Sequence, residues 1–463
     1  MAEPAPKAVS APEGNEQRQI AARIERLPLT WTQRKARIIV GTATFFDGYD
    51  SIMLGLVMPV IAADWHLTNA DIGFLLSGTF VGQLLGALLF PYLAERFGRL
   101  RACIYSVWVV GLMSLLCAAT WNFASLAVSR MIQGVGIGGE IPVAATYINE
   151  IARSDRRGRF FALYESAFGL GYVGAALLGL LLVSRYGWHI MFVIGAVPAL
   201  IAAVMRRTVP ESPRWLAEKG RVAEADAIVA GMERAAVSKL GRPLPPPDLS
   251  QVPFPPSRHT HLRELFNPFY RTRTLVIWSI WGFSFFVSQA LVSWMPTLYR
   301  QQLHLSLDQT FRFSLTTQVL GVIGAIAIAM FIDRTGRRAW IAGALLCGSA
   351  AMLVLVTQGT SDVAMVLVCA IIANFALGTV SVSIYMYTSE LYPTRMRALG
   401  TGMGSTVRNI FTSSSPPLVA LMLNNFGLTG VFTMLGVAPL VPALMIICFG
   451  TETSGRVLEE VSP

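Results

Sequence analysis

Charged side chains are scarce in this chain of 463 residues, in which Asp, Glu, Lys and Arg together make up 14%. Soluble domains carry about 25%. Cysteine is scarce as well, and Cys103, Cys117, Cys347, Cys369 and Cys448 lack the spacing of metal ligands, so we expect no metal and no cofactor. Residues 1–35 contain no apolar run, which argues against a cleavable signal peptide. These scarcities exclude an ordinary soluble enzyme domain.

Hydrophobic residues, at 54%, are abundant instead and are gathered into long runs. A helix that spans a bilayer needs roughly 20 mostly apolar residues. The sequence predicts twelve such helices, at 36–62, 72–94, 101–120, 123–148, 159–184, 188–206, 274–298, 311–332, 339–358, 362–388, 397–423 and 428–450. We expect an all-α membrane protein made of an N-terminal tail (1–35), a six-helix bundle (36–206), a connecting loop (207–273), a second six-helix bundle (274–450) and a C-terminal tail (451–463).

Two segments outside the predicted membrane helices carry local patterns. In the N-terminal tail, Ile20, Ile24 and Leu27 share one helical face, which predicts either a short helix on the membrane surface or a disordered tail. The connecting loop has a helical pattern around 215–237, followed by a proline-rich extended stretch at 243–256. The loop is too short to form an enzyme domain of its own.

Landmarks of the first half recur in the second half in the same order. They are ERFGRLRAC at 95–103 and DRTGRRAWI at 333–341, Glu150 with Arg157 and Glu390 with Arg397, and Glu211 and Glu452. A duplicated unit of about 240 residues built on apolar helices is typical of secondary transporters.

The net charge of +10 is distributed unevenly along the chain. Most of the 37 Lys and Arg residues fall in the tails and in the loops on the same side as the amino terminus, while Arg185, Arg300 and Arg312 fall on the other side. This bias predicts that both termini lie in the cytoplasm. Because no basic soluble domain is present to bind nucleic acid, we expect no nucleic-acid partner.

The repeated loop motif, the paired Glu and Arg residues and RMIQGVGIGGE at 130–140 resemble the major facilitator superfamily. PESPR and TETSGRVLEE, after helices six and twelve, are similar to its sugar-porter and organic-ion branch. Residues 138–216 are similar to niacin transporters and to proteins like synaptic vesicle protein 2, and DGYD at 47–50 is similar to the DGFD of aromatic acid/proton symporters. The resemblance implies a fold in which helices 1, 4, 7 and 10 line a central cavity. The chain departs from the loop motif at Pro91 and Ala329, where the superfamily has glycine.

Charged residues at the helix junctions of both halves are candidates for a cytoplasmic gate. Salt bridges among them would tie the cytoplasmic helix ends together when the cavity opens outward, and would break when it opens inward. Exposed pairs contribute only about 0–1 kcal/mol each, which suits a latch that must release. The candidates are Glu95, Arg96, Arg99, Glu150, Arg157, Glu211, Asp333, Arg334, Arg337, Glu390, Arg397 and Glu452. The alternative is that these charges only set the topology.

Charges inside the predicted helices cost about 2.5–3.5 kcal/mol each to insert, so each needs a function or a partner. Asp47, Asp50, Arg130 and Glu140 are such residues, and we interpret them as candidates for proton coupling. Since helices 1 and 4 line the cavity in the superfamily, the resemblance makes Asp50 and Arg130 candidate partners. An aspartate held by an arginine stays ionised, and desolvation favours its protonated form once the arginine is drawn away. A static ion pair that fixes packing is the alternative.

Arg408 is predicted to lie at mid-depth in the eleventh helix, with no acidic residue in its own helix. Its planar guanidinium suits bidentate binding of a carboxylate. Rings and amides of helices seven and ten would complete a pocket for a small planar aromatic acid, the candidates being Trp281, Phe285, Phe286, Gln289, Asn374 and Tyr385. The alternative is that the aromatic residues only pack or face lipid.

We expect a proton-coupled importer of a small organic monocarboxylate, nicotinate or a benzoate-type acid, that works by alternating access. The alternatives are efflux by proton antiport, disfavoured because residues 169–179 lack the proline of such pumps, and sugar symport, which has no use for Arg408. A receptor without transport is disfavoured by the four intact membrane charges. The expected partners are the acid, protons and the lipid bilayer, and the expected location is a bacterial-type inner membrane, with the protein a monomer.

Overall fold

The computed structural model describes residues 11–153, 157–249, 262–360, 362–393 and 396–453. The side chains of residues 11–14, 157–159, 162, 325–334 and 398 are not part of this description. Three gate candidates, Arg157, Asp333 and Arg334, therefore lie outside the described side chains.

The N-terminal half consists of helices that cross the bundle back and forth. Two of them begin with capping boxes, in which Thr30 and Gln33 close the start of the first crossing and Thr68 and Asp71 close the start of the second. The crossings are α2 (Trp31–Trp65), α3 (Asn69–Phe97), α4 (Arg99–Ala118), α5 (Phe123–Ile151), α6 (Arg157–Leu178) continued by η2 (Gly179–Val183) and α7 (Ser184–Tyr186), and α8 (His189–Gly195) with α9 (Val197–Thr208).

The C-terminal half repeats this arrangement after two short helices and a 3-10 turn, α10 (Pro213–Glu218), α11 (Val222–Leu240) and η4 (Leu262–Phe266). Its crossings are α12 (Pro268–Gln301), α13 (Leu307–Thr335), α14 (Arg337–Gln358), α15 (Val363–Leu391), α16 (Arg397–Val437) and α17 (Leu440–Phe449). The long α16 contains a break at Gly427, whose φ of 61° is not helical, so its last turns belong with α17 to the final crossing.

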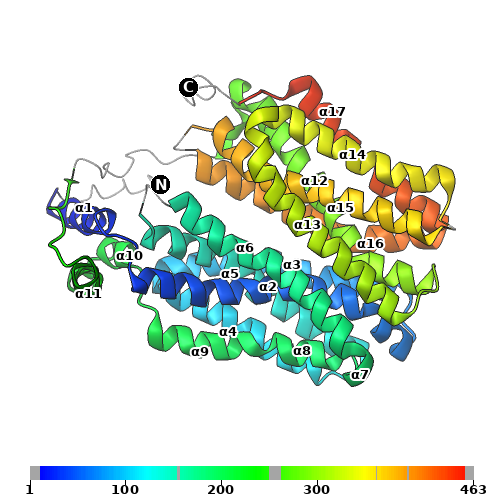
Figure 1. The fold of residues 1–463 in the computed structure, drawn as a ribbon, viewed down its shortest axis with the longest axis horizontal. Coiled ribbons are helices and arrows are strands. Elements are labelled where there is room, and N and C mark those ends of the chain that lie inside the picture. Colours follow the sequence, from blue (N-terminus) through cyan, green and yellow to red (C-terminus); the bar gives the residue numbers. More distant parts are fainter. Residues whose placement is uncertain (1–10, 154–156, 250–261, 361, 394–395, 454–463) are drawn as a thin grey trace, which may run out of the picture.

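Each of the twelve predicted stretches coincides with one helix or with consecutive helices, and the described residues form no strand, so the predicted all-α fold is confirmed. By length and composition alone, nine segments of the described chain could cross a membrane, one of them the double stretch Leu399–Phe449. Figure 1 shows two groups of roughly parallel helices, with α1 (Ala11–Glu25), α10 and α11 at one end. We call this the basic end, because most of the Lys and Arg residues lie in the tails and loops that meet there.

Helices α3 and α5 approach each other through four glycines. A Cβ atom on any of them would overlap backbone atoms of the facing helix, Gly82 and Gly86 meeting α5 and Gly134 and Gly138 meeting α3. Two such small-residue pairs let membrane helices come into backbone contact. The close approach positions Arg130, which lies one turn before Gly134, against α3.

The N-terminal tail forms helix α1, which packs against protein. Ile20 and Ile24 are buried with Trp215 of α10 and Val229 of α11, so a helix lying on the membrane surface is not what the structure contains. Arg23 donates from Nε and Nη2 to the two carboxylate oxygens of Glu233, at 3.0 and 2.8 Å. These bonds from Arg23 hold the pKa of Glu233 below its usual range. The tail and the connecting loop thus form one small unit outside the bundle.

The two halves meet mainly away from the basic end. Their contacts run between α2 and α12, α3 and α16, and α6 and α13. Gly55 of α2 lies against the backbone of Ser293, Gly73 of α3 lies against Pro417, and the side-chain amides of Asn69 and Asn424 are 2.7 Å apart. One hydrophobic core includes the ends of α2 and α3 far from the basic end together with most of the second half. The basic-end part of the first half has a separate core.

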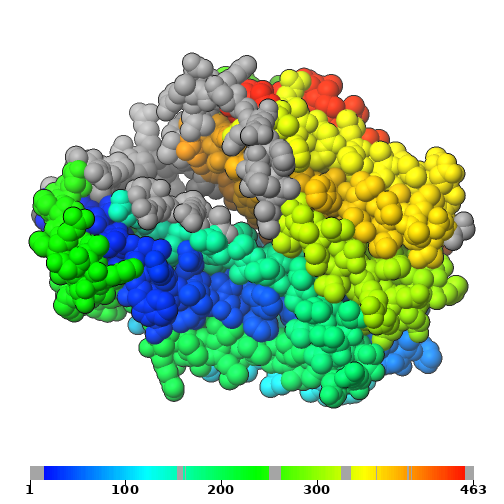
Figure 2. All heavy atoms as spheres, in the orientation of Figure 1, coloured from blue at the N-terminus to red at the C-terminus, as the bar shows by residue number. Residues whose placement is uncertain are grey.

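The halves are therefore sealed at the far end and spread apart at the basic end. Figure 2 shows the corresponding hollow between the two halves on the side of α1, α10 and α11.

We expect Gly138→Val to destabilise the protein by about 1–3 kcal/mol, because its side chain would overlap the backbone of Gln83, which cannot move aside as a side chain could. Thermal unfolding of the purified protein in detergent measures the effect. Gly343→Val is the matched control, since a Cβ atom at Gly343 of α14 meets nothing within 4 Å. Equal unfolding temperatures for the two variants would contradict the packing of α3 on α5.

Candidate functional site

Asp50 of α2 and Arg130 of α5 form an ion pair in the middle of the first half. Both side chains are 2% exposed, and Nη1 of Arg130 lies 3.0 Å from each carboxylate oxygen of Asp50. The guanidinium also lies over the ring of Phe192, 5.8 Å from its centroid. The structure thus brings together the two residues that the sequence nominated as partners.

Two further residues complete this network and were missed by the sequence analysis. Gln133 donates to Asp50 and accepts from Arg130, at 3.0 and 2.7 Å, and Thr79 of α3 accepts from Nε of Arg130 at 3.2 Å. The i,i+3 spacing of Arg130 and Gln133 on one helix face could have indicated the first. No sequence signal indicated Thr79, because only the glycine contact of α3 with α5 brings it there. Every charge of the pair is therefore hydrogen-bonded, which a buried ion pair requires.

Asp47 and Glu140 form a second buried pair, on the basic-end side of the first. Their side chains are 2% and 0% exposed and their carboxyl groups interact electrostatically with each other. The hydroxyl of Thr44 lies 3.0 Å from Oε1 of Glu140, while Oδ2 of Asp47 and Oε2 of Glu140 have no partner in the described structure. Two neighbouring carboxylates repel each other when both are ionised, so this arrangement favours a proton on one of them.

Arg408 of α16 lies among aromatic rings at mid-depth in the second half. Its guanidinium lies over the ring of Phe285 at 5.3 Å, and its Nη1 is 3.4 Å from the hydroxyl of Tyr385. Trp281 stacks on Phe285 with an angle of 10° between the rings, and it meets Tyr385 edge-on. Nε and Nη2 of Arg408 donate to the amide oxygen of Asn409. Four of the predicted substrate residues thus form one cluster.

The remaining substrate candidates lie outside this cluster. Asn374 donates to the carbonyl of Thr317 and lines a small void between α12, α13 and α15 toward the far end. Phe286 is buried, and its carbonyl accepts from Ser415. Gln289, one turn beyond Phe285, has a buried Nε2 without a partner among the described residues. Gln289 therefore has a buried polar group that a ligand could satisfy.

An acidic residue of the other half, Glu165 of α6, faces Arg408. The two groups are close enough to interact electrostatically, yet they form no ion pair within 4 Å in the described structure. Glu165 and Tyr385 are both exposed to solvent although protein surrounds them deep in the fold, which is the mark of side chains that line a cavity. The sequence placed Glu165 inside a helix but could not place it opposite Arg408.

At the basic end, Glu211 and Glu452 bind the first backbone amides of α4 and α14. Carboxylates are favoured there because the first N–H groups of a helix lack intrahelical partners. The bonds are Leu100 N to Glu211 at 2.8 Å, Arg101 N to Glu211 at 3.4 Å, Arg337 N to Glu452 at 3.0 Å and Arg338 N to Glu452 at 3.1 Å.

Glycines make room for both carboxylates. Gly98 and Gly336, which precede α4 and α14, have φ values of 119° and 84°, and a Cβ atom on either would collide with the capping carboxylate. These two positions therefore require glycine for conformation and for space.

Four other gate candidates form ion pairs within their own half. Arg99 lies 3.2 Å from Glu150, and Arg337 lies 3.3 Å from Glu390. Each carboxylate accepts a second hydrogen bond from the hydroxyl that follows a capping glutamate, Ser212 for Glu150 and Thr453 for Glu390.

Three gate candidates stand apart from these pairs. The side chains of Glu95 and Arg96 are exposed at the end of α3, and Arg397 donates to the carbonyl of Tyr392. Within the part of the chain that the structure describes, the hydrogen bonds and ion pairs reported at the basic end each join residues of one half. The latch that the sequence suggested stays a prediction.

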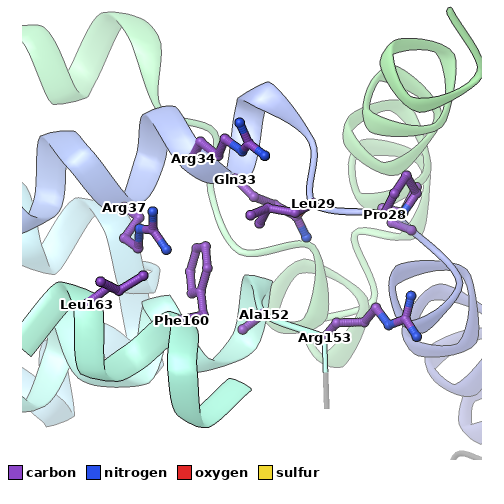
Figure 3. Close-up of a pocket in the computed structure, with 10 residues that line it drawn as sticks. Pro28, Leu29, Gln33, Arg34, Arg37, Ala152, Arg153, Phe160 and Leu163 are labelled. Carbon is purple, nitrogen blue, oxygen red and sulfur yellow. The ribbon is translucent and has the colours of Figure 1, made fainter. Parts of the chain in front are cut away.

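A cavity of about 450 Å³ lies at the basic end, away from the Asp50–Arg130 ion pair and the Asp47–Glu140 pair of acids. Figure 3 shows Arg34, Arg37 and Arg153 around it, with the ring of Phe160 below Arg37. Arg37 lies 4.7 Å from the centroid of that ring.

Comparison with known proteins agrees with this geometry. A sequence model of the Major Facilitator Superfamily matches residues 40–416 and 319–459. The niacin transporter NiaP of Acinetobacter baylyi is 33% identical over 448 residues, which cover 96% of this chain and 99% of that protein. The gallate transporter of Pseudomonas putida is 28% identical and covers 92% of this chain and 94% of its own length.

Among solved structures, the xylose transporter XylE from E. coli in an inward open conformation has the same fold. The TM-score is 0.71 at 19% sequence identity, and the match covers 93% of this chain and 99% of that one. Such a match shows the fold alone. The match of the family model over most of the chain shows more: this protein belongs to the Major Facilitator Superfamily, and it is a membrane transporter rather than an enzyme.

Proposed function

We propose that this transporter imports a small aromatic monocarboxylate, nicotinate or a benzoate-type acid, together with protons. The observation that carries this proposal is the cluster of Arg408, Phe285, Tyr385 and Trp281 at mid-depth in the second half. The relatives described as niacin and gallate transporters carry small aromatic acids, which supports the same substrate class.

The cluster offers complementary groups to both parts of such a substrate. The guanidinium of Arg408 now donates to the neutral amide oxygen of Asn409, which a carboxylate would replace with stronger, charge-assisted bonds. The stacked rings of Trp281 and Phe285 and the edge of Tyr385 offer apolar surface to a planar ring. A sugar would leave the charge of Arg408 without an anion.

Proton coupling is assigned to the buried charges of the first half. Asp50 with Arg130, and Asp47 with Glu140, are sealed from solvent and lie at mid-depth, where ionisable groups mark proton or ion pathways in membrane proteins. Coupling requires that a proton be accepted on one side of the membrane and released on the other. Carboxyl groups whose partners can separate or share a proton provide this.

The basic end is assigned to the cytoplasm of a bacterial inner membrane, because positively charged loops are retained on that side. The structure is then inward-facing, and the transporter acts as a monomer. The separate pairs of Arg99 with Glu150 and Arg337 with Glu390 would form bonds across the halves when the inward opening closes.

Arg408→Ala is expected to weaken substrate binding by at least about tenfold, because a charge-assisted hydrogen bond to a buried anion contributes roughly 1.5–3 kcal/mol. Arg408→Lys should recover little, since the ammonium lacks the planar fork. Wild type should prefer nicotinate over nicotinamide, and the alanine variant should lose that preference. Competition with labelled nicotinate on purified protein measures both effects, with Arg312→Ala, an exposed arginine paired to Asp308, as control. An alanine variant that keeps the wild-type preference for the acid would show that Arg408 is structural.

Asp50→Asn is expected to abolish accumulation driven by a pH gradient in proteoliposomes while exchange of substrate remains. The variant leaves Arg130 buried without its anion, which costs about 3–5 kcal/mol, so lower yield is expected as well. The double variant Asp50→Asn/Arg130→Gln removes both charges and should regain yield but not accumulation. Full accumulation by either variant would exclude Asp50 as a carrier of the coupled proton and would leave the pair a packing element.

Glu150→Lys is expected to shift the protein toward the inward-open state, because lysine would repel Arg99 and weaken any bond across the closing halves. Spin labels at Phe97 and Phe269, exposed at the basic end of either half, report the separation of the halves in a background without native cysteines. The substitution Glu224→Lys, on the exposed face of α11, is the control. An unchanged distance distribution for Glu150→Lys would support a purely topological role for these charges.

A further inference from the structure

Three carboxyl groups of the first half extend from the Asp50–Arg130 pair to the cavity in front of Arg408. Asp47 interacts electrostatically with Asp50, Glu140 with Asp47, and Glu165 with Glu140. Glu165 in turn faces Arg408 of the other half. They come from α2, α5 and α6, and each lies closer to the basic end than the one before. An arginine stands at either end of this row of acids.

The inner part of the row contains polar atoms that the described structure leaves unsatisfied. Oδ2 of Asp47, Oε2 of Glu140 and the hydroxyl of Tyr164 have no partner, although all three side chains are nearly completely buried. Tyr164 lies beside Thr44, whose hydroxyl is bonded to Glu140. Buried polar groups are hydrogen-bonded in native proteins with few exceptions, so these atoms indicate exchangeable protons or water at this place.

The outer part of the row opens to the cavity. Glu165 is exposed to solvent, whereas Asp47 and Glu140 are sealed from it, so Glu165 is the member that can exchange a proton with bulk water. The titratable groups that face the row from the surrounding helices are Cys103 of α4, Tyr164 of α6 and Tyr385 of α15, all neutral in their usual state. Among the described residues, Arg130 and Arg408 are therefore the cations beside its two ends.

We propose that Glu165, Glu140 and Asp47 form a proton path between the cytoplasmic cavity and the Asp50–Arg130 pair, in which Glu165 competes with the substrate carboxylate for Arg408. This proposal rests on the proposed function. A proton that has entered from the outside leaves Asp50, passes the Asp47–Glu140 pair and reaches the carboxylate of Glu165, which becomes neutral. When that proton leaves to the cytoplasm, the renewed negative charge of Glu165 compensates Arg408 and displaces the substrate anion. One proton and one monocarboxylate are then released together.

The competition predicts a pH dependence with a definite sign. Raising the pH through the titration of Glu165 ionises its carboxyl group, so substrate affinity of the wild type should fall by about tenfold over that pH range. Glu165→Gln cannot become negative, so its affinity should stay within about twofold over that range and match the low-pH value of the wild type. Binding of labelled nicotinate to purified protein gives these affinities. Asp308→Asn, on the exposed far end, should follow the wild type.

Transport assays distinguish the role of the proton path from that of the substrate-binding site. In proteoliposomes, Glu165→Gln and Glu140→Gln should exchange labelled nicotinate at rates within about threefold of the wild type, but should lose accumulation driven by a pH gradient. Glu165→Asp should restore accumulation in part, which a merely structural role of the side chain would not predict. For Glu140→Gln, the retained exchange shows that the variant is folded.

Two results would overturn the proposal. One is Glu165→Gln protein that accumulates nicotinate fully and keeps the pH dependence of binding. The other is wild-type accumulation that follows a sodium gradient instead of a pH gradient, because the unsatisfied oxygens would then bind a metal cation rather than protons. Failure of the proposed function has a different signature, since wild-type protein would then neither bind nor exchange nicotinate or benzoate.

Discussion

The buried ion pair of Asp50 and Arg130 is the interaction on which the first half depends. A charge in the hydrocarbon region is costly unless it is paired and hydrogen-bonded, and here Gln133 and Thr79 satisfy what the two partners leave open. That arrangement requires α5 to lie against α3 at backbone distance, which Gly134 and its facing glycines allow. In this half, the burial of the ion pair therefore depends on the close packing of α3 against α5.

The two halves share a plan at the basic end and differ in their interiors. Glu211 and Glu452 cap equivalent helices, and Glu150 and Glu390 bind equivalent arginines, as expected of a duplicated unit. At mid-depth, by contrast, the first half holds its carboxyl groups and the second half holds aromatic rings around Arg408. The two halves therefore share the capping and pairing of their basic ends and differ in the side chains that they hold at mid-depth.

The conformation explains why the inner charges and the gate charges have such different surroundings. At the far end, the halves touch through contacts such as Gly55 with Ser293, so Asp50 and Arg130 are buried away from solvent. At the basic end, the halves stand apart, so Glu165 meets water and the pairs of Arg99 and Arg337 remain within their own halves. In an alternating-access cycle these environments would exchange, and the partners of the buried carboxyl groups would change with them.

The sequence by itself determined the twelve helices, the duplication and the residues that carry charge inside the membrane. The length of an apolar run and a charged residue within it can both be recognised without knowledge of the fold. The sequence also nominated Asp50 with Arg130, helped by the family resemblance. It could not show that Glu165 faces Arg408, that Asn374 lies away from the aromatic cluster, or that α1 packs on α10 and α11. Those facts depend on which helix faces touch across hundreds of residues. Packing in three dimensions decides this, because a charge that has no partner in its own helix is neutralised by whichever helix the fold brings alongside it.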